Sequence, residues 1–310
     1  MSEKPARVLP PPTLVHRLEY AALRILVGVL SLLPRRVRAI LGGAAGRLGY
    51  WPLGIRRGVV ELQLAESFPE MNASQRARIA AHSYAHLGRV AVETSIASGY
   101  DAKGILDLFY EETGWEHVAN PIQAGQGVIL VSAHLGNWEL GAAYMSARGV
   151  PVSAVTRRMR NPLFDAYITR ARRRLGWNVV YDHDAVRKLP RAIADGHVVP
   201  MLADQGVKGL AATFVPFFGR LARTPKGPAL FALRLKAPMV IGIVTRRADG
   251  MYAIHFEPVA VNDTGDRDRD VDNLVAEYTR AVEKWVRKFP DQYLWQHRRW
   301  RRRPDGTLAY

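Results

Sequence analysis

The chain has 310 residues, a length that allows a large buried core in one big domain or two small ones. It contains no cysteine, which excludes both a disulfide framework and a thiol nucleophile. Lysine and arginine number 44 against 28 aspartates and glutamates, so the formal net charge of +16 indicates an anionic partner such as phosphorylated lipid, an acidic protein, a membrane surface or nucleic acid.

The N-terminal region is apolar but interrupted by charge. Residues 14–33 predict a helix whose uninterrupted apolar stretch, residues 25–33, is too short to cross a bilayer alone. A basic segment and a second apolar stretch, residues 39–49, follow it. We expect residues 1–50 to form a membrane-associated segment with its arginines at phosphate level, and residues 51–310 to form the main domain. A core helix packed on that domain is the alternative.

A capping box predicts the next long helix. Asn72 and Gln75 have the spacing of such a box, and the helix is expected to reach about residue 98. His82 and His86 stand four residues apart on it, which is a spacing of metal ligands. Because no third ligand is evident, we expect a structural or surface role for this pair.

A polar hexapeptide follows the first buried strand expected in the main domain. Residues 127–133 are a short apolar run typical of such a strand, and residues 138–148 predict a helix. His134 then lies at the carboxyl end of a strand, where open α/β sheets place their ligands. The Gly136-Asn137 break lets Glu139 fold back on His134, as suits a general base oriented by a carboxylate. The alternative is a buried histidine and a helix-start glutamate without chemistry.

The remainder of the chain alternates between strand-like and helical segments, which predicts an α/β fold with a mixed central sheet and helices on both faces. The expected strands are 152–155, 179–181, 198–203, 239–244 and 252–256, and the expected helices are 162–175, 185–194, 225–235 and 270–288.

Seven arginines and one acid, Asp165, lie between residues 157 and 174. Arg157 follows a strand on the same sheet edge as His134, and Arg172 lies on the next helix. Arginine pairs phosphate oxygens in a bidentate manner, so we expect a phosphate site here, with a solvated basic face as the alternative.

Two later segments are also candidate binding regions. Asp204 and Gln205 follow the strand at 198–203, and the segment from Gly219 through Arg223 and Thr224 is expected to open a helix whose amides bind an anion. One of Phe217 and Phe218 is expected to line an apolar tunnel, the alternative being an ordinary loop with both in the core. Trp295 and Trp300, set among arginines, are expected at a membrane interface, the alternatives being a disordered basic end or a nucleic-acid patch.

Three motifs occur in one order along the chain. They are His-Leu-Gly-Asn-Trp-Glu at 134–139, the block from Asp204 to Gly227 with Phe217-Phe218-Gly219, and Gln-Tyr-Leu-Trp-Gln-His-Arg-Arg-Trp at 292–300. Together they resemble the late acyltransferases of lipid A biosynthesis, over residues 18–304. The family usually carries Asn-Leu before the Phe-Pro pair at 68–69, whereas this chain carries Gln63-Leu64.

The resemblance implies that residues 51–310 form a catalytic domain with a glycerolipid-acyltransferase-like fold, which carries out O-acyl transfer at the cytoplasmic face of the inner membrane. The donor would be an acyl-carrier-protein or coenzyme A thioester, and the acceptor a hydroxyl of a phosphorylated glycolipid. His134 would be the general base, supported by Glu139. The substrate-binding residues would be Gly136, Asn137, Arg157, Arg172, Asp204, Gln205, Phe217, Phe218, Gly219, Arg223 and Thr224.

Amides near Gly136, or Arg157, would stabilise the tetrahedral oxyanion. Since the thioester is already activated, no cofactor or metal is expected, and no nucleic acid is expected as a partner. Transfer to another envelope lipid, such as a lysophospholipid, a glycolipid or an ornithine lipid, is the alternative within the class. A serine hydrolase acting through Ser132 is the alternative from another class, although the G-x-S-x-G nucleophile elbow is missing.

Overall fold

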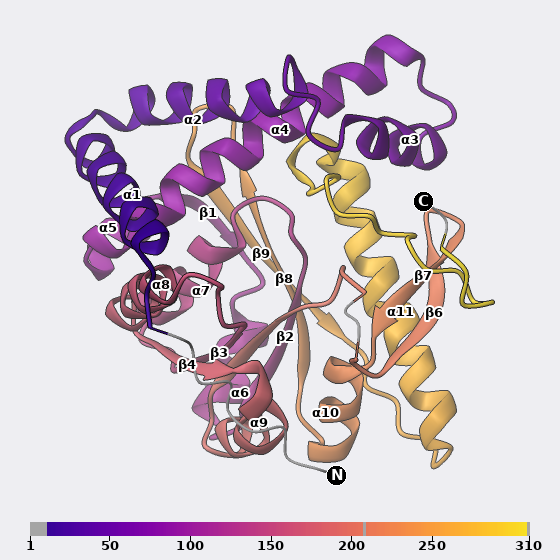
Figure 1. Cartoon of the computed structure of the whole chain (residues 1–310). Helices are drawn as coiled ribbons and strands as arrows, with labels where there is room; N and C mark the ends of the chain where they lie inside the picture. Colours follow the sequence, from indigo (N-terminus) through magenta and orange to yellow (C-terminus); the bar gives the residue numbers. More distant parts are fainter. Residues whose placement is uncertain (1–10, 207–208, 309–310) are drawn as a thin grey trace.

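A seven-stranded sheet forms the centre of the computed structural model, which describes residues 11–206 and 209–308 (Figure 1). The strand order is β1-β9-β8-β2-β5-β3-β4, with a separate two-stranded hairpin of β6 and β7. The strands are β1 Phe109–Thr113, β2 Val128–Ser132, β3 Val152–Thr156, β4 Trp177–Tyr181, β5 Val198–Leu202, β6 Ala212–Phe217, β7 Arg220–Pro225, β8 Met239–Arg246 and β9 Tyr252–Val259. The α-helices are α1 Leu14–Leu32, α2 Arg35–Tyr50, α3 Arg57–Ser67, α4 Ala73–Ile96, α5 Ala102–Leu106, α6 Glu116–Gln123, α7 Trp138–Ala147, α8 Pro162–Arg174, α9 Ala185–Ala194, α10 Gly227–Leu235 and α11 Arg267–Lys288.

The sheet is mixed and buried on both faces. Strand β2 is parallel to β5 and β8, whereas β9 is antiparallel to β8 and parallel to β1. Successive side chains of a strand point to opposite faces, and β2 shows this directly. Ile129 and Val131 join one hydrophobic core cluster, and Val128 and Leu130 join the other. The prediction of an α/β fold with a mixed sheet between helical layers is confirmed.

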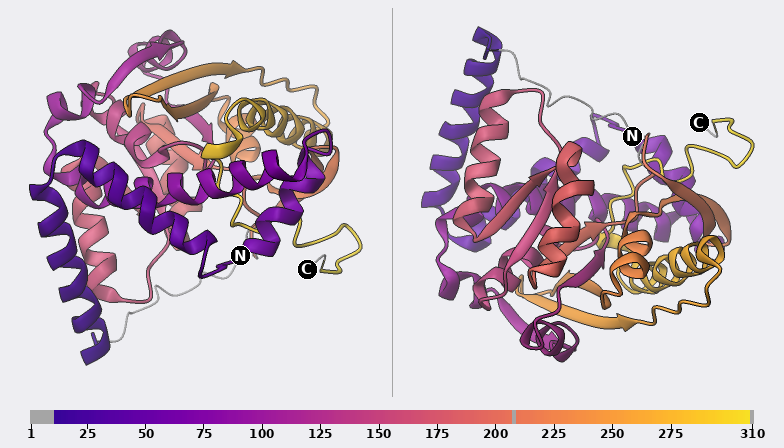
Figure 2. Two further views of the ribbon diagram at one scale, coloured as in Figure 1. Left: turned by 90° about the horizontal axis from the view of Figure 1, so that it is seen from above. Right: turned by 90° about the horizontal axis from the view of Figure 1, so that it is seen from below.

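Helices α2 to α4 cover one end of the molecule, at the top of Figure 1, and α1 runs down the left side toward α8. The view from above in Figure 2 shows α2 lying across α4. Glycines permit this close approach. A Cβ atom added at Gly88 would lie 2.0 Å from the carbonyl oxygen of Gly42, and one added at Gly46 would lie 2.0 Å from that of Tyr84. Helix α4 begins with the expected capping box between Asn72 and Gln75. Within the described ranges, none of the helices is long and apolar enough to cross a bilayer.

The segment after β6 differs from the prediction. Residues Gly219 to Thr224 were expected to open a helix, but they form the turn and second strand of the β6–β7 hairpin, and α10 begins only at Gly227. Phe218 and Gly219 have φ values of 51° and 72°, as the two central residues of a type I′ hairpin turn require. The side chains of this segment alternate between the two faces of a hairpin strand, and no helix begins in it. Strand β1 was not predicted either.

The C-terminal segment enters the core, and the expectation of a membrane interface there is wrong. Trp295 is 1% exposed and Trp300 is 2% exposed. Gln63 holds this segment in place: its side-chain amide donates to the carbonyl oxygens of Trp295 and His297 and accepts from the amide of Arg299 at 2.7 Å. Gln63 thus makes three long-range hydrogen bonds to the C-terminal segment.

Candidate functional site

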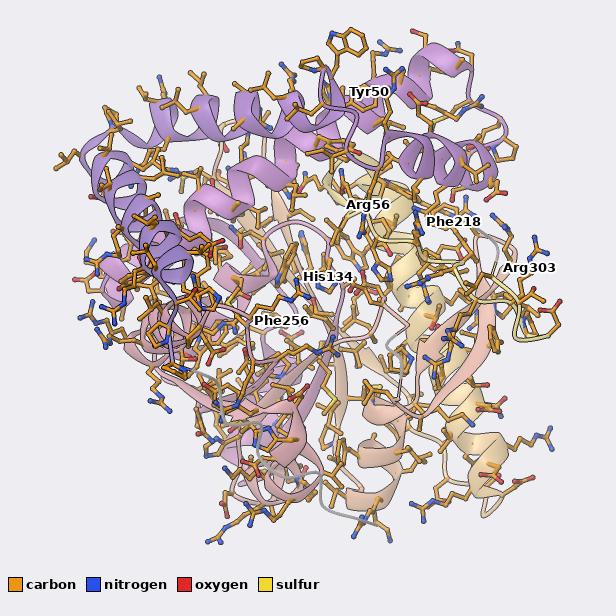
Figure 3. All side chains as sticks on the ribbon, viewed as in Figure 1. Tyr50, Arg56, His134, Phe218, Phe256 and Arg303 are labelled. Atoms are coloured by element: carbon orange, nitrogen blue, oxygen red, sulfur yellow. The ribbon has the colours of Figure 1, made fainter. Side chains whose placement is uncertain are left out.

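His134 and Asp204 face each other across two neighbouring parallel strands. Ser132 at the end of β2 is paired with Leu202 at the end of β5, so the residues two positions further on are opposite one another. The Nδ1 atom of His134 lies 2.8 Å from Oδ1 of Asp204, and the backbone amide of His134 donates to Oδ2 at 3.2 Å. Figure 3 places His134 near the centre of the view, far from Arg303 at the edge. The pair occupies the carboxyl edge of the sheet that the sequence predicted.

The two groups shift each other's pKa in opposite directions. Burial lowers the pKa of His134, but the charge and hydrogen bond of Asp204 and the charge of Glu139 outweigh it, so this pKa lies above the ordinary 6.5. Burial raises the pKa of Asp204, but the charge and hydrogen bonds of His134 and the charge of Arg299 hold it below 3.8. Asp204 is therefore a carboxylate, which only accepts, and Nδ1 of His134 must be the donor. Nε2 is left as the basic atom of the ring.

Glu139 lies in the first turn of α7, as predicted, but it is bonded to an arginine rather than to His134. Arg172 donates from Nε to Oε2 at 3.1 Å and from Nη2 to Oε1 at 2.5 Å. The same guanidinium donates to the hydroxyl of Thr156 at 2.7 Å. Glu139 thus acts on His134 through its charge, while the hydrogen bond that orients the ring comes from Asp204.

Helix α4 holds the turn between His134 and α7 in place. Gly136 has a φ of 60°, and an added Cβ atom would lie 1.5 Å from the carbonyl oxygen of Val244, so only glycine fits. His86 lies 3.1 Å from the carbonyl oxygen of Gly136 through Nε2. Burial above all, and the charges of Arg246 and Arg89, lower the pKa of His86 to about 4 despite that bond, so the ring is neutral at pH 7 and donates.

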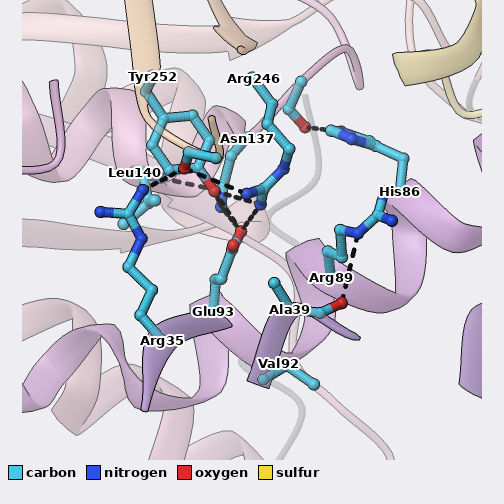
Figure 4. A network of polar contacts seen from close by, with 12 residues as sticks. Arg35, Ala39, His86, Arg89, Val92, Glu93, Asn137, Leu140, Arg246 and Tyr252 are labelled. Carbon is cyan, nitrogen blue, oxygen red and sulfur yellow. Dashed lines mark hydrogen bonds and ion pairs between the residues drawn. The ribbon is translucent and has the colours of Figure 1, made fainter. Parts of the chain in front are cut away.

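Asn137 connects the same turn to a buried charged cluster (Figure 4). Its Oδ1 atom caps α7 by accepting from the amide of Leu140, and its Nδ2 atom donates to Glu93 at 3.1 Å and lies 3.4 Å from the hydroxyl of Tyr252. Arg246 forms an ion pair with Glu93 and also donates to Tyr252. Asn137 is fully buried, so it positions the turn and is not open to a ligand.

An apolar cavity adjoins the motif. Its empty volume is about 650 Å³ when the open solvent at its mouth is included. Trp138, Glu139 and Arg172 belong to its lining, together with apolar residues that include Met145 and Phe256. The Trp138 ring packs against the His134 ring at 4.9 Å between centroids. A wider depression at the opposite end of β2 and β8 contains no residue of the three motifs.

The remaining predicted site residues are placed in three ways. Gln205 follows Asp204 and is half-buried, and Arg157 follows β3 at the same sheet edge, exposed and 3.5 Å from Asp182. Phe217 and Phe218 pack in the core against aromatic rings, and neither lines the cavity beside Trp138. Gly219, Arg223 and Thr224 belong to the β6–β7 hairpin, where Arg299 donates to the Arg223 carbonyl and to the Thr224 hydroxyl.

Ser132 does not have the placement of a nucleophile. It is buried, and its hydroxyl donates to the carbonyl oxygen of Gly242 at 2.6 Å. His82 is exposed while His86 is buried, so the two do not form one site. No cluster of three potential metal ligands occurs among the residues that the structure describes.

Sequence reasoning missed the partnership of His134 with Asp204, although it named both residues. Each follows a buried strand, but nothing in the sequence says that β2 and β5 are neighbours, because β3 and β4 lie between them in the chain. It also missed Glu93, Arg246 and Tyr252, which come from distant segments without a shared motif.

Comparisons with known proteins bear on these residues. Residues 13–302 match the family described as bacterial lipid A biosynthesis acyltransferase. The lipid A biosynthesis lauroyltransferase of Escherichia coli K12 is 29% identical over 91% of this chain and 92% of its own length. The palmitoleoyltransferase of the same organism is 28% identical over the same shares. A phosphatidylinositol mannoside acyltransferase of Mycolicibacterium smegmatis is 23% identical over 40% of this chain and 42% of its own length.

Proposed function

The chain belongs to the bacterial lipid A biosynthesis acyltransferase family and is an acyltransferase, and from this premise we propose that it transfers a fatty acyl chain from an acyl-carrier thioester to a hydroxyl of a lipid A precursor. The observation that carries the proposal is the His134–Asp204 pair at the carboxyl edge of the sheet, next to an apolar cavity.

His134 is the proposed general base. Its Nδ1 atom is bound to Asp204, so Nε2 takes the proton as the acceptor hydroxyl attacks the thioester carbonyl. The new C–O bond forms first and gives a tetrahedral intermediate; its collapse re-forms the carbonyl and breaks the C–S bond, and the imidazolium returns the proton to the departing thiolate. Asp204 keeps the ring in the required tautomer and stabilises the imidazolium.

The first turn of α7 supplies the proposed oxyanion donors. The amide of Gly136 donates to the carbonyl oxygen of Gln292 at 3.0 Å and is occupied. The amides of Trp138 and Glu139 open the helix and have no intrahelical acceptor, and the helix dipole favours negative charge at this end. These two amides therefore replace the Gly136 amide as the proposed donors that stabilise the oxyanion of the tetrahedral intermediate.

Glu139 and Arg172 form the second part of the proposed machinery. The carboxylate of Glu139 supports the imidazolium by charge. Arg172, which also donates to the hydroxyl of Thr156, holds this carboxylate in place. Two bonds to Glu139 occupy the guanidinium of Arg172, so we assign it a positioning role. Arg157 is exposed at the same edge and is the proposed contact for phosphate groups of the acceptor or of the donor's prosthetic arm.

The apolar cavity beside Trp138 is the proposed site of the acyl chain. Its lining comes from the sheet and from α7, with Met145 and Phe256 among the apolar side chains. It takes the role that was expected of one of Phe217 and Phe218, both of which are buried in the core. The donor would be an acyl carrier protein or coenzyme A thioester, and both deliver an acyl chain through the same thioester chemistry.

Helix α1 is the proposed membrane-associated element, on the cytoplasmic face of the inner membrane. Leu14, Leu18, Ile25, Val29 and Leu32 recur at helical spacing on one face, and each is more than half exposed. Tyr20 and Leu30, on the opposite face, pack against the protein. A helix whose solvent side is the apolar side suits the interface of a bilayer.

Transfer to another envelope lipid is the second candidate function. It is favoured by the similarity to the phosphatidylinositol mannoside acyltransferase, which covers 40% of this chain. Both functions use the same base and the same thioester chemistry, and they differ in the acceptor that gains mass.

Mass spectrometry of host lipids separates the two. The protein would be expressed in a host that lacks its own late acyltransferases, beside His134→Ala as the inactive control. We expect lipid A to gain one acyl chain with the active protein alone. A gain confined to phospholipid or glycolipid would establish the second function, and no gain in any lipid would contradict both.

A further inference from the structure

Exposed apolar side chains are concentrated at one end of the chain. Fifteen of the 23 large hydrophobic residues exposed on the described part of the molecule lie between residues 14 and 62. Single exposed hydrophobic residues are normal on a soluble protein, but a contiguous group marks an interaction surface. Helix α1 accounts for some of them, and α2 with the loop that follows it accounts for most of the others.

The outer face of α2 is apolar while its inner face is made of small residues. Ile40, Leu41 and Leu48 recur along the outer face, and the loop continues it; we call these three with Trp51, Leu53 and Ile55 the α2 surface. Their exposed fractions are 68, 46, 53, 68, 66 and 56% in that order. The inner face packs Gly42 and Gly46 against α4. This helix presents its large apolar side chains outward, the reverse of a helix on a water-soluble domain.

The charge around this surface is of one sign. Residues 14–57 contain eight arginines, one acid, Glu19, and neither lysine nor aspartate. Glu19 accepts a hydrogen bond from Asn161. Arg36 and Arg47 are exposed on α2, on one flank of its apolar face. An apolar surface bordered by arginines is complementary to lipid acyl chains beneath anionic phosphate.

We infer that the α2 surface inserts into the headgroup region of an anionic phospholipid bilayer, as a membrane contact separate from α1. Trp51 is the exposed tryptophan among the seven, the other six being buried or half-buried, and the guanidinium of Arg57 lies 5.8 Å from its ring centroid. Indole rings favour the headgroup level of a bilayer. A second copy of the chain is a poorer occupant, because two such surfaces would bring their arginines together.

The α2 surface also lies close to the catalytic turn. Helix α2 rests on α4, and α4 supplies His86 and Glu93 to the turn at Gly136 and Asn137 (Figure 4). Packed helices have axes about 8–10 Å apart, so one helix layer separates the α2 surface from this turn. Docking through the α2 surface places that side of the molecule toward the membrane, where a lipid acceptor lies. This last relation rests on the proposed function, but docking itself does not.

Fluorescence quenching by brominated lipid tests the insertion. The full chain would be mixed with vesicles of phosphatidylcholine containing about one third phosphatidylglycerol, with bromine on the acyl chains. We expect quenching of tryptophan emission, and we expect Trp51→Phe to remove more than half of it, since the other indoles are shielded by protein. Equal quenching of the wild type and of Trp51→Phe, or no quenching of vesicle-bound protein, would overturn the inference.

Matched variants test the affinity. Leu53→Ser with Ile55→Ser should weaken binding to these vesicles about tenfold, from lost apolar burial. Val186→Ser with Leu221→Ser, at similarly exposed positions on other elements, should leave it unchanged. Arg36→Gln with Arg47→Gln should weaken binding only when phosphatidylglycerol is present.

Other occupants of the surface would give different results. Vesicle binding that is indifferent to all three pairs of substitutions would overturn the proposal. The proposal would also be overturned if Leu53→Ser with Ile55→Ser lowered self-association on sedimentation but left vesicle binding unchanged. That result would identify a second copy of the chain as the partner. None of these measurements uses acyl transfer, so they stand or fall apart from the proposed activity.

Discussion

The imidazole Nδ1 of His134 lies 2.8 Å from the carboxylate of Asp204, 70 positions later in the chain. The two residues extend neighbouring parallel strands in register, so backbone pairing of the sheet sets their separation. Glu139, five residues from His134, is instead paired with Arg172. The residue that orients the base is thus remote in sequence and adjacent in the sheet.

Asp204→Asn is expected to lower kcat by about 10²–10⁴-fold with little change in KM, because the asparagine amide no longer holds the ring in the tautomer that leaves Nε2 basic. His134→Ala should lower kcat at least as much. Steady-state kinetics with a thioester donor would measure this. Near-normal turnover of Asp204→Asn would show that the pair has no catalytic role.

The pH dependence of kcat/KM should have its acid limb above pH 6.5. The neutral imidazole is the active base, so activity rises with pH through the pKa of His134, which Asp204 and Glu139 raise against the effect of burial. Asp204→Asn removes the larger raising charge and should move the limb to lower pH. A limb that stays in place in this variant would contradict the assignment of His134 as the titrating base.

Glu139→Gln should lower kcat less than Asp204→Asn and should move the acid limb down by a smaller amount. Its charge ranks behind that of Asp204 among the causes that raise the pKa of His134. Substrate affinity should be retained. Arg172→Lys is the companion variant, since it keeps the positive charge but loses the bidentate geometry. If Glu139→Gln acted through KM alone, Glu139 would be a binding residue.

His86→Gln should make the free energy of unfolding depend less on pH between pH 6.5 and 4. The folded pKa of His86 is about 4 against 6.5 for the free side chain, so the wild type loses stability as pH falls from 6.5 toward 4, by about 3 kcal/mol from this residue. The glutamine amide can still donate to Gly136 but does not titrate. Urea unfolding across this pH range measures the effect, and His82→Gln, at an exposed position on the same helix, should change nothing. The same slope in His86→Gln and wild type would refute the prediction.

Gly88→Ala should destabilise the protein by about 1–3 kcal/mol, because the new methyl group must push α2 away from α4. Gly28→Ala is the control: it lies within α1 with no atom near the added carbon, and it should not lower stability. Chemical unfolding monitored by circular dichroism would report both. Equal stability of the two variants would mean that the α2–α4 contact adjusts without cost.

Sequence patterns predicted elements better than they predicted partners. The alternation of apolar runs and helical segments located β2, β3, β5, β8 and β9, because buried strands of an α/β sheet read as continuous apolar stretches. Strand β1 was missed, since all five of its residues are half-buried or exposed and it contains no apolar run.

The same limit applies to the site. His134, Asp204 and Glu139 were all recognised as candidates, but the pairing of Asp204 with His134 depends on strand order, which no local pattern records. Trp295 and Trp300 were misplaced because an arginine-rich tail with indoles suits a membrane interface as well as a core. In the structure the tail is held in the core by hydrogen bonds from Gln63, which lies 232 positions from Trp295.

The register between β2 and β5 also has a thermal consequence. A dyad built on mobile loops can lose its geometry while the domain stays folded, by local opening at low free energy. Here the backbone hydrogen bonds of the central strands hold both residues, so the dyad separates only when the sheet itself opens. Heat inactivation and loss of amide protection in β2 and β5 should therefore occur together, as one cooperative event.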